Sequence, residues 1–207
     1  MLSTIQSQKR ALRKSMSTAL RSLDPLSVME QSRAVAAQVL ALPAFQGCKN
    51  VSCFLSMPLG ELDTSEIVAE ILKSENKSLF VPKVCSDGAM EFMKLYNQRD
   101  LDTLSSGLWG IREPSVDWEN SPRVNAMDAG LDVILMPGVA FDRSMSRLGH
   151  GKGYYDRYIA RYVASGRPRP LLVSLALRNQ LLDLTIPVDE HDCKMDMIVT
   201  PDEIVMV

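Results

Sequence analysis

The chain reads Asp142-Arg-Ser-Met-Ser-Arg-Leu-Gly-His-Gly-Lys-Gly-Tyr-Tyr-Asp156 in its most informative segment, with three glycines at alternate positions and a lysine between the last two. An apolar run at 131–136, typical of a buried strand, precedes this segment, and a helical pattern follows it. Glycines let main-chain N–H groups approach phosphate oxygens closely, and a helix start adds unpaired donors and a positive dipole end. The order of strand, glycine loop and helix predicts a phosphate site; the alternative is an ordinary glycine-rich turn.

The spacing of this loop excludes two common phosphate-binding motifs. The Walker loop requires Gly-x-x-x-x-Gly-Lys-Ser/Thr, but Ser146 stands at its first glycine and Gly153 follows the lysine. The dinucleotide motif requires Gly-x-Gly-x-x-Gly, whereas this loop is Gly-x-Gly-x-Gly. Lys152 adds a mobile positive charge to the loop, which is consistent with a phosphorylated ligand of another kind.

Composition narrows the function classes. A chain of 207 residues fits one domain over 1–207. The net charge of -2 provides no general attraction to nucleic acid, and no apolar run is long enough to cross a membrane. The four cysteines form no Cys-x-x-Cys pair, which favours reduced thiols and argues against structural zinc, although His191-Asp-Cys193 keeps one candidate. Cys53 lies in an apolar strand pattern and is predicted to fill core space.

The first 23 residues contain five Lys or Arg residues and no acidic residue. They fit either a mitochondrial transit peptide or a permanent first helix with a basic face. Helical spacing places an apolar stripe along this segment, with Lys9 inside the stripe and Arg13 at its edge; the stripe comprises Ile5, Leu12, Met16 and Leu23. Lys9 either lays its stem along the apolar surface with its amine in water, or points into a ligand site.

Strands and helices alternate along the rest of the chain. Strands are predicted at 50–56, 78–82, 90–96, 131–136, 170–176, 197–200 and 204–206, and helices at 25–41, 63–72, 153–165 and, in a short form, 178–182. This pattern predicts an α/β fold, a three-layer αβα single domain with a largely parallel, Rossmann-like sheet. Ligands bind beyond the carboxyl ends of such strands, so the glycine loop and the segment after Leu55 are predicted to face one cleft.

The periodic pattern breaks down between Asn97 and Gly130. Both tryptophans, Trp109 and Trp118, lie in this stretch, and we expect an ordered functional loop there. Trp109 either anchors the loop to the core or stacks on a ligand.

Several separate segments together resemble one family. They are Lys9-Arg10-Ala-Leu-Arg13, Phe54-Leu-Ser-Met57 with Glu61 after it, Trp109-Gly-Ile-Arg-Glu-Pro114, Arg147-Leu-Gly-His-Gly-Lys-Gly-Tyr-Tyr-Asp156 and Pro187-Val-Asp-Glu-His-Asp192. Their order and spacing resemble the 5-formyltetrahydrofolate cyclo-ligase family, also called methenyltetrahydrofolate synthetase, over nearly the whole chain. The resemblance implies ATP- and magnesium-dependent conversion of 5-formyltetrahydrofolate to 5,10-methenyltetrahydrofolate, with release of ADP and phosphate. The formyl oxygen would be phosphorylated, N10 would attack the activated carbon, and the ring would close as phosphate departs.

The resemblance also implies roles for individual residues. ATP would be contacted from the first helix by Lys9, Arg10 and Arg13, and from the glycine segment by Arg147, Leu148, Gly149, His150, Gly151, Lys152, Gly153, Tyr154 and Tyr155. Lys152 and Arg147 would be catalytic, with Lys152 stabilising transition-state charge. The folate pocket would be lined by Leu55, Met57, Glu61, Trp109, His150 and Tyr154. Magnesium would be held by Asp156 and Asp192, because one or two carboxylates together with phosphates and waters suffice.

Simpler roles remain open for several of these residues. Asp156 could favour the helix dipole in its first turn, and Asp192 could be an ordinary loop carboxylate. One of Tyr154 and Tyr155 could belong to the core while the other faces the ligand. His150 is interpreted as adjacent to the ligand rather than catalytic, because the family varies at this position.

The expected partner is 5-formyltetrahydrofolate, with or without a polyglutamate tail, bound by a monomer in the cytoplasm or, if the N-terminal segment is a transit peptide, in the mitochondrion. Neither nucleic acid nor membrane is an expected partner. One competing hypothesis is another phosphate-handling α/β enzyme, such as a sugar-phosphate isomerase or an acyl-CoA transferase, that does not hydrolyse ATP. The other is a non-catalytic protein that binds nucleic acid or an anionic membrane through its basic helix; the net negative charge weighs against it.

Overall fold

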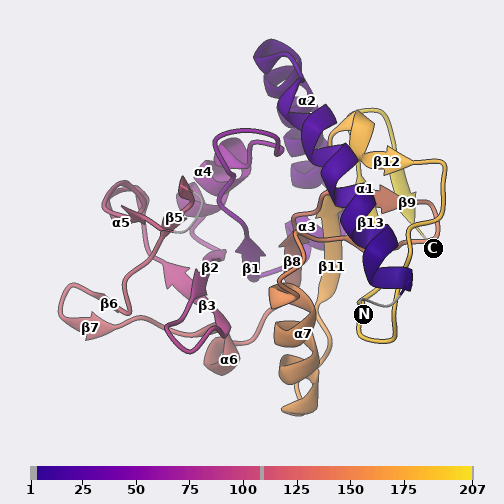
Figure 1. Ribbon diagram of the computed structural model, residues 1–207. Coiled ribbons are helices and arrows are strands. Elements are labelled where there is room, and N and C mark those ends of the chain that lie inside the picture. The colour runs from indigo at the N-terminus through magenta and orange to yellow at the C-terminus, as the bar shows by residue number, and fades with distance from the viewer. Residues whose placement is uncertain (1–3, 108–109, 207) are drawn as a thin grey trace.

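The computed structural model describes residues 4–107 and 110–206, and its centre is a seven-stranded sheet (Figure 1). In sheet order the strands are β14 (Ile204–Met206), β13 (Met197–Val199), β11 (Leu171–Leu175), β8 (Val133–Met136), β1 (Asn50–Cys53), β2 (Ser78–Val84) and β3 (Met90–Leu95). The five inner strands run parallel, and β14 and β3 add antiparallel edges. The prediction of an α/β fold with a large, mostly parallel sheet is confirmed, and all seven predicted strands are present.

Strand β8 explains why its sequence is continuously apolar. Val133 and Leu135 pack into the hydrophobic core on one face of the sheet, and Ile134 and Met136 pack into the core on the other face. Strands buried on both faces have no solvent-facing positions that could be polar. Each fully buried Val, Ile or Leu side chain of this kind stabilises the fold by about 1.5–3 kcal/mol.

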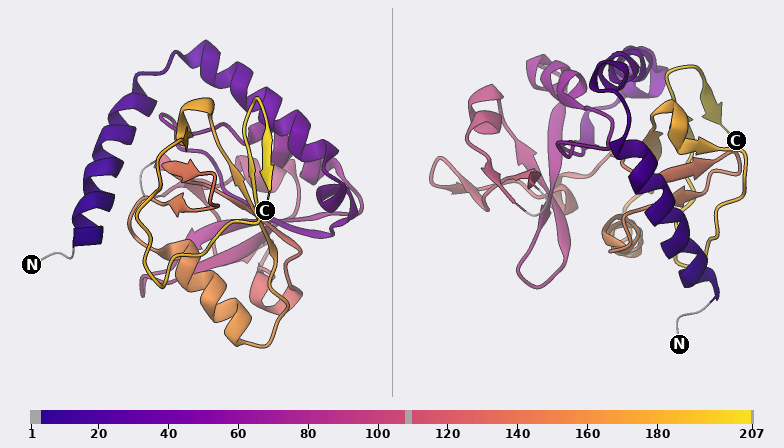
Figure 2. Two further views of the ribbon diagram at one scale, coloured as in Figure 1. Left: turned by 90° about the vertical axis from the view of Figure 1, so that its right-hand side faces the viewer. Right: turned by 45° about the horizontal axis from the view of Figure 1, so that its top comes forward.

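Helices pack on both faces of this sheet (Figure 2). One core includes residues of α1 (Thr4–Arg21), α2 (Pro25–Ala41), α3 (Pro43–Gly47) and α4 (Ser65–Lys73). The other includes residues of α6 (Ala126–Ala129) and α7 (Tyr154–Ala164). Asp24 caps α2 by accepting a hydrogen bond from the Ser27 amide at 3.1 Å, as its position before Pro25 predicts. Cys53 is fully buried in the first core, as predicted.

A small second sheet carries the segment that leads into the glycine loop. It comprises β10 (Arg147–Leu148), β9 (Ala140–Asp142) and β12 (Leu181–Leu182). The buried carboxylate of Asp142 ties its parts together, because it accepts hydrogen bonds from the amides of Ser144, Ser146 and Ile186. Burial alone would raise the pKa of Asp142, but these hydrogen bonds outweigh burial and lower it. The expected short helix at 178–182 is wrong in part: a 3-10 turn at Arg178–Gln180 passes directly into β12.

The stretch from Asn97 to Gly130 contains more regular structure than its pattern predicts. It holds α5 (Gln98–Asp102), the paired strands β4 (Ser105–Ser106) and β5 (Arg112–Glu113), the paired strands β6 (Asp117–Trp118) and β7 (Ser121–Pro122), and α6. A buried ion pair between Asp100 and Arg123, with two hydrogen bonds of 2.6 Å, holds this stretch together. The Arg123 guanidinium also lies 5.4 Å from the ring centre of Trp118. The tertiary pairing of these two charges orders a segment whose local sequence shows no period.

None of the helices in residues 4–107 and 110–206 combines the length and apolar character needed to cross a membrane.

Candidate active site

Two pockets meet at the glycine loop, beyond the carboxyl ends of the central strands. We call the first the apolar pocket; its lining includes Phe54, Leu55 and Met57 after β1, Pro82 and Val84 of β2, Met90 of β3, Pro137 after β8, and Tyr154 and Tyr155 of α7. We call the second the basic pocket; its lining includes Lys9, Arg10 and Arg13 of α1, Arg157 of α7, and residues 189–193. The predicted cleft between the glycine loop and the segment after β1 is therefore present as the apolar pocket.

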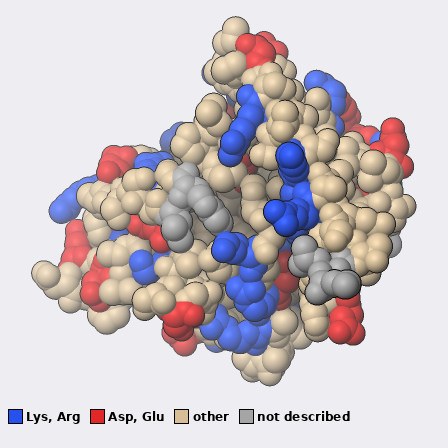
Figure 3. Space-filling view, viewed as in Figure 1, with Lys and Arg blue, Asp and Glu red and all other residues tan. Residues whose placement is uncertain are grey.

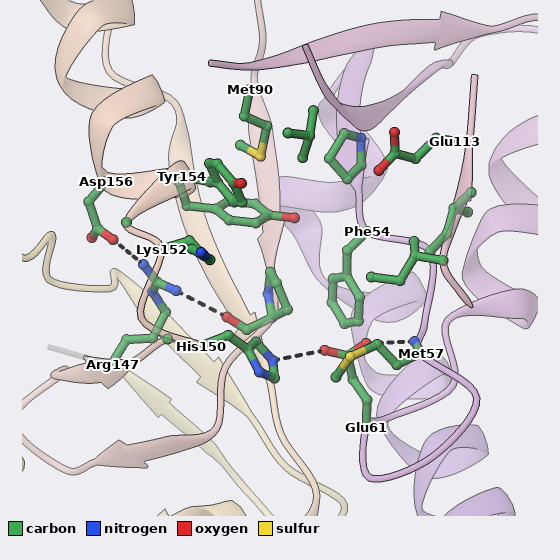
Figure 4. A pocket seen from close by; sticks show the side chains of 18 residues that line it. Phe54, Met57, Glu61, Met90, Glu113, Arg147, His150, Lys152, Tyr154 and Asp156 are labelled. Carbon is green, nitrogen blue, oxygen red and sulfur yellow. Dashed lines mark hydrogen bonds and ion pairs between the residues drawn. The ribbon is translucent and has the colours of Figure 1, made fainter. Parts of the chain in front are cut away.

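Four residues line both pockets and form the wall between them: Arg147, Gly149, Gly153 and Asp156. Arg147 is buried, and its Nη2 donates to Asp156 Oδ2 at 2.7 Å while its Nη1 donates to the Pro137 carbonyl at 3.3 Å (Figure 4). Its Nε is buried but has no hydrogen-bond partner in the described part of the chain. A buried guanidinium with an unsatisfied donor at this boundary is suited to an anionic ligand group.

The glycine loop has the backbone geometry that only glycine adopts easily. Gly151 has φ 98° and Gly153 has φ 64°, both in the left-handed region. The loop also lies close to α1: Arg13 Nε donates to the Gly149 carbonyl at 2.8 Å, and a Cβ at Gly151 would lie 3.3 Å from Arg13 Cζ. Glycine at these positions therefore permits both the turn and the approach of the basic helix.

Lys9 is the anchor between α1 and the loop before β13. Its side chain is 8% exposed, and its Nζ donates to Asp189 Oδ2 at 2.9 Å and also to Asp192 Oδ2. Burial alone would lower the pKa of Lys9, but its bonds to the two carboxylates outweigh burial and raise it. The alternative in which the amine reaches water is wrong, because the amine lies in the basic pocket between two carboxylates.

Asp156 and Asp192, the carboxylates predicted to hold magnesium, line this same basic pocket. Asp156 Oδ1 accepts from the Cys193 amide at 3.1 Å, and Asp192 Oδ2 accepts from the Asp189 amide at 2.8 Å as well as from Lys9. Within residues 4–107 and 110–206, no group of three or more His, Cys, Asp or Glu residues is arranged to hold a metal. Two carboxylate side chains fit magnesium only if phosphates and waters complete its oxygen shell.

The predicted folate residues lie on the apolar pocket. Leu55, Met57, Glu61, His150 and Tyr154 all line it. Glu61 is 8% exposed; its Oε2 accepts from the Met57 amide at 2.8 Å, and its Oε1 lies 3.6 Å from His150 Nε2 (Figure 4). These contacts fix a buried carboxylate at the inner wall, where it can accept hydrogen bonds from ligand N–H groups.

The other predicted site residues differ in whether they line a pocket, pack into the core or lie outside the described residues. Lys152 is exposed and lines the apolar pocket. Tyr154 and Tyr155 both line that pocket while packing against the core, so the division into one core and one ligand-facing tyrosine is wrong. Burial raises the pKa of Tyr155, and nearby Glu61 raises it further. Leu148 is 1% exposed and packs into the core, so its side chain reaches neither pocket. Trp109 lies outside the described residues.

Sequence reasoning missed several residues that the fold brings to the site. Asp189 binds Lys9 beside Asp192, and its position three residues earlier in the same loop was the available signal. The apolar pocket also takes Val84 and Met90 from the β2–β3 hairpin and Ile111 and Glu113 from the region of β5. Val84 and Met90 lie at or just beyond the ends of predicted strands, whereas Ile111 and Glu113 lie in the stretch without a periodic pattern, and neither context distinguishes a pocket wall from a core.

Comparisons with known proteins show the family of this chain. The model of the 5-formyltetrahydrofolate cyclo-ligase family matches residues 5–201. The chain is 35% identical to the 5-formyltetrahydrofolate cyclo-ligase of Mus musculus, covering 96% of each chain. It is 34% identical to the mitochondrial 5-formyltetrahydrofolate cyclo-ligase of Arabidopsis thaliana, covering 99% of this chain and 78% of that one. The solved structure of Aquifex aeolicus 5,10-methenyltetrahydrofolate synthetase matches with a TM-score of 0.76 and 31% identity, covering 96% of this chain and 92% of that one. The protein therefore belongs to the 5-formyltetrahydrofolate cyclo-ligase family.

Proposed function

We propose that this protein converts 5-formyltetrahydrofolate to 5,10-methenyltetrahydrofolate, with ATP hydrolysed to ADP and phosphate. The observation that carries the proposal is the wall of Arg147, Gly149, Gly153 and Asp156, which lines the apolar and the basic pocket at once. A reaction that moves a phosphoryl group from a nucleotide to a reduced pterin requires two binding sites that meet at the transferred group. Family membership supplies the substrate class, and the shared wall supplies the meeting point.

The basic pocket is the proposed nucleotide site. Lys9, Arg10 and Arg13 supply cationic groups from α1, and the glycine loop supplies main-chain amides at the start of α7. Bound magnesium, held by Asp156 and Asp192 together with phosphate oxygens, would neutralise charge on the phosphates. Arg157 lines the same pocket and adds a further cation at its rim.

The apolar pocket is the proposed folate site. Its aliphatic and aromatic lining fits a flat bicyclic ring, and Glu61 accepts hydrogen bonds from the pterin amino and ring N–H groups. Leu55, Met57 and Tyr154 pack against the ring from the segment after β1 and the start of α7. His150, 3.6 Å from Glu61, borders the ligand without a chemical role in this proposal.

The chain contributes positioning and charge stabilisation. The formyl oxygen on N5 is a poor leaving group until it is phosphorylated, after which N10 attacks the carbon and phosphate departs. Both nucleophiles belong to the substrate, so no nucleophilic side chain is required. Lys152 stabilises the charge of the transferring phosphoryl from the folate side of the wall, and Arg147, held by Asp156, donates from within the wall.

The proposal also covers the scaffold that carries the site, the oligomeric state, the compartment and the partners of the protein. The parallel sheet with helices on both faces would act as a three-layer, Rossmann-like scaffold that places ligands beyond its carboxyl edge. The protein would act as a monomer on folates with or without polyglutamate tails, in the cytoplasm or, like the Arabidopsis thaliana relative by its name, in the mitochondrion. Nucleic acid and membranes would not be partners, because the net charge is -2 and three of the cationic residues of α1, Lys9, Arg10 and Arg13, line the basic pocket.

An omission experiment tests the proposal. Purified protein is incubated with 5-formyltetrahydrofolate, ATP and magnesium, and the near-ultraviolet absorbance of the methenyl product is followed. We expect product only when all three components are present, with one ADP formed per methenyl product. Product formed without ATP would rule out activation by phosphorylation. Calorimetric titration with ATP and with the folate, separately and together, then determines whether each pocket binds its ligand independently.

A further inference from the structure

Arg157 of α7 connects the two pockets across the glycine loop. It lines the basic pocket, but its Nη1 donates to the main-chain carbonyl of Lys152 at 2.6 Å, and Lys152 lines the apolar pocket. The Arg157 guanidinium also lies 5.4 Å from the ring centre of Tyr154, another residue of the apolar pocket (Figure 4). One side chain on the basic side therefore contacts two residues that line the pocket of the other proposed ligand.

The Arg157 side chain packs directly on the glycine loop. A Cβ at Gly153 would lie 3.1 Å from Arg157 Nη1, which is closer than ordinary van der Waals contact. Gly153 has φ 64°, and its carbonyl accepts a hydrogen bond from the Arg157 amide at 3.1 Å. The main chain and the side chain of Arg157 thus both hold the turn that joins Lys152 to Tyr154.

The position of this arginine is unfavourable for the helix itself. Arg157 is the fourth residue of α7, near the positive end of the helix dipole, where an acidic residue such as Asp156 is stabilising and a cation is not. The other Lys and Arg side chains of the basic pocket repel it, and Figure 3 shows Lys and Arg gathered along the hollow in the centre of this face. A residue that breaks a local preference in this way points to a functional role.

Lys152 depends on its main chain for its position. Its side chain is exposed, and its Nζ forms no hydrogen bond or ion pair with the described parts of the chain, 4–107 and 110–206. A displacement of about 1 Å at a catalytic group can lower a rate by about 100-fold. The carbonyl that Arg157 binds belongs to Lys152 itself, so this contact fixes the point from which the Lys152 ammonium group reaches a ligand.

We propose that Arg157 is a positioning residue, which holds the main chain of Lys152 and the ring of Tyr154 so that the ammonium group meets the transferring phosphoryl. The inference rests on the proposed function, which assigns the charge of that phosphoryl to Lys152. Arg157 then acts on the rate through Lys152 and not on the affinity for either ligand. A direct contact between Arg157 and a phosphate would instead lower ATP affinity, and a purely structural role would lower stability.

A double-mutant cycle tests this dependence. We measure kcat, the KM of the folate and the calorimetric Kd of ATP for the wild type, Arg157→Ala, Lys152→Ala and the double variant. Arg157→Ala should lower kcat by about 10- to 100-fold and change the Kd and the KM by less than about twofold. In the Lys152→Ala background the same change should lower kcat by less than about twofold, because the group that Arg157 positions is absent. Arg157→Lys keeps a donor and a cation beside the ring, and it should recover most of the rate.

Arg167, beyond the C-terminal end of α7, offers a matched control. It donates to the Asp128 carbonyl at 2.8 Å, and its guanidinium lies 5.9 Å from the ring centre of Tyr162. It therefore repeats the two contacts of Arg157 at a place outside the glycine loop. Arg167→Ala should keep the wild-type kcat, and Arg157→Ala should keep the wild-type thermal unfolding midpoint.

Several results would overturn the proposal. They are a wild-type kcat in Arg157→Ala, an undiminished effect of Arg157→Ala in the Lys152→Ala background, a loss of rate shared by Arg167→Ala, and a loss confined to the Kd of ATP. If the wild type formed no methenyl product, the proposed function would fail, but proteolysis would still test the contact. Endoproteinase Lys-C should cut after Lys152 about tenfold faster in Arg157→Ala than in the wild type or Arg167→Ala. Equal rates of cleavage would show that Arg157 does not hold the loop.

Discussion

Lys9 and Asp192 lie 183 positions apart in the chain and form a hydrogen-bonded ion pair in the basic pocket. The pair joins the first helix to the loop before β13, and Asp189 binds the same ammonium group at 2.9 Å. The residue predicted to contact ATP and the residue predicted to hold magnesium are therefore direct partners. This relationship fixes α1 against the basic pocket, which Lys9, Arg10 and Arg13 line.

Replacing Lys9 should affect nucleotide binding and stability together. Lys9→Ala leaves two carboxylates without their cation, and we expect ATP to bind about tenfold more weakly and the free energy of unfolding to fall by about 1–2 kcal/mol. Calorimetric titration and chemical denaturation measure the two effects. Lys14→Ala, an exposed change on the same helix, is the control and should alter neither. Normal ATP affinity in Lys9→Ala would remove α1 from the proposed nucleotide site.

Lys152 provides the sharpest test of the proposed chemistry. Lys152→Ala should lower kcat by about 100- to 1,000-fold, the loss observed when one charge-stabilising donor is removed from a transition state. The side chain is exposed, so the unfolding midpoint should stay at the wild-type value. Lys49→Ala, an exposed lysine before the amino end of β1, should keep full activity. A wild-type rate in Lys152→Ala would contradict the assigned role.

The buried pair of Asp100 and Arg123 should dominate the stability of the 97–130 segment. Asp100→Asn leaves a buried guanidinium without its charge partner, and we expect a loss of about 3 kcal/mol in the free energy of unfolding. Glu119→Gln removes the exposed partner of Arg99 and should cost less than about 0.5 kcal/mol. Urea denaturation of both variants measures the difference. Equal losses would mean that burial of the first pair is not what orders the segment.

Asp142 predicts how stability depends on pH. Its folded-state pKa is lowered below the ordinary 3.8, so the carboxylate stabilises the fold at pH values above the unfolded pKa. That stabilisation should disappear as the pH falls below 3.8 and through the folded pKa. The amide side chain that Asp142→Asn introduces does not titrate, so the variant should be less stable at neutral pH and should lose less of its stability in this acid range. Parallel pH profiles of the two proteins, measured by denaturation, would contradict this account.

Most strands and the main helices could be predicted because their signals are local. The apolar run at 131–136 predicts a strand buried on both faces, and Val133 and Ile134 do belong to opposite cores. The cap at Asp24 and the glycines before α7 can likewise be predicted from the neighbouring residues alone. The short strands β9, β10 and β12 were not predictable, because strands of two or three residues are held by partners distant in the chain.

By itself, the sequence of this protein determined the order of strands and helices, the glycine loop at the start of α7, and a family resemblance that the comparisons support. Only the tertiary structure decided that Lys9 binds Asp189 and Asp192, that Leu148 belongs to the core, and that Arg147 and Asp156 form the wall between two pockets. The physical reason is the distance along the chain over which each kind of interaction acts. Periodicity and caps act over a few neighbouring residues, whereas the pairing of buried charges and the walls of a pocket depend on how distant segments pack.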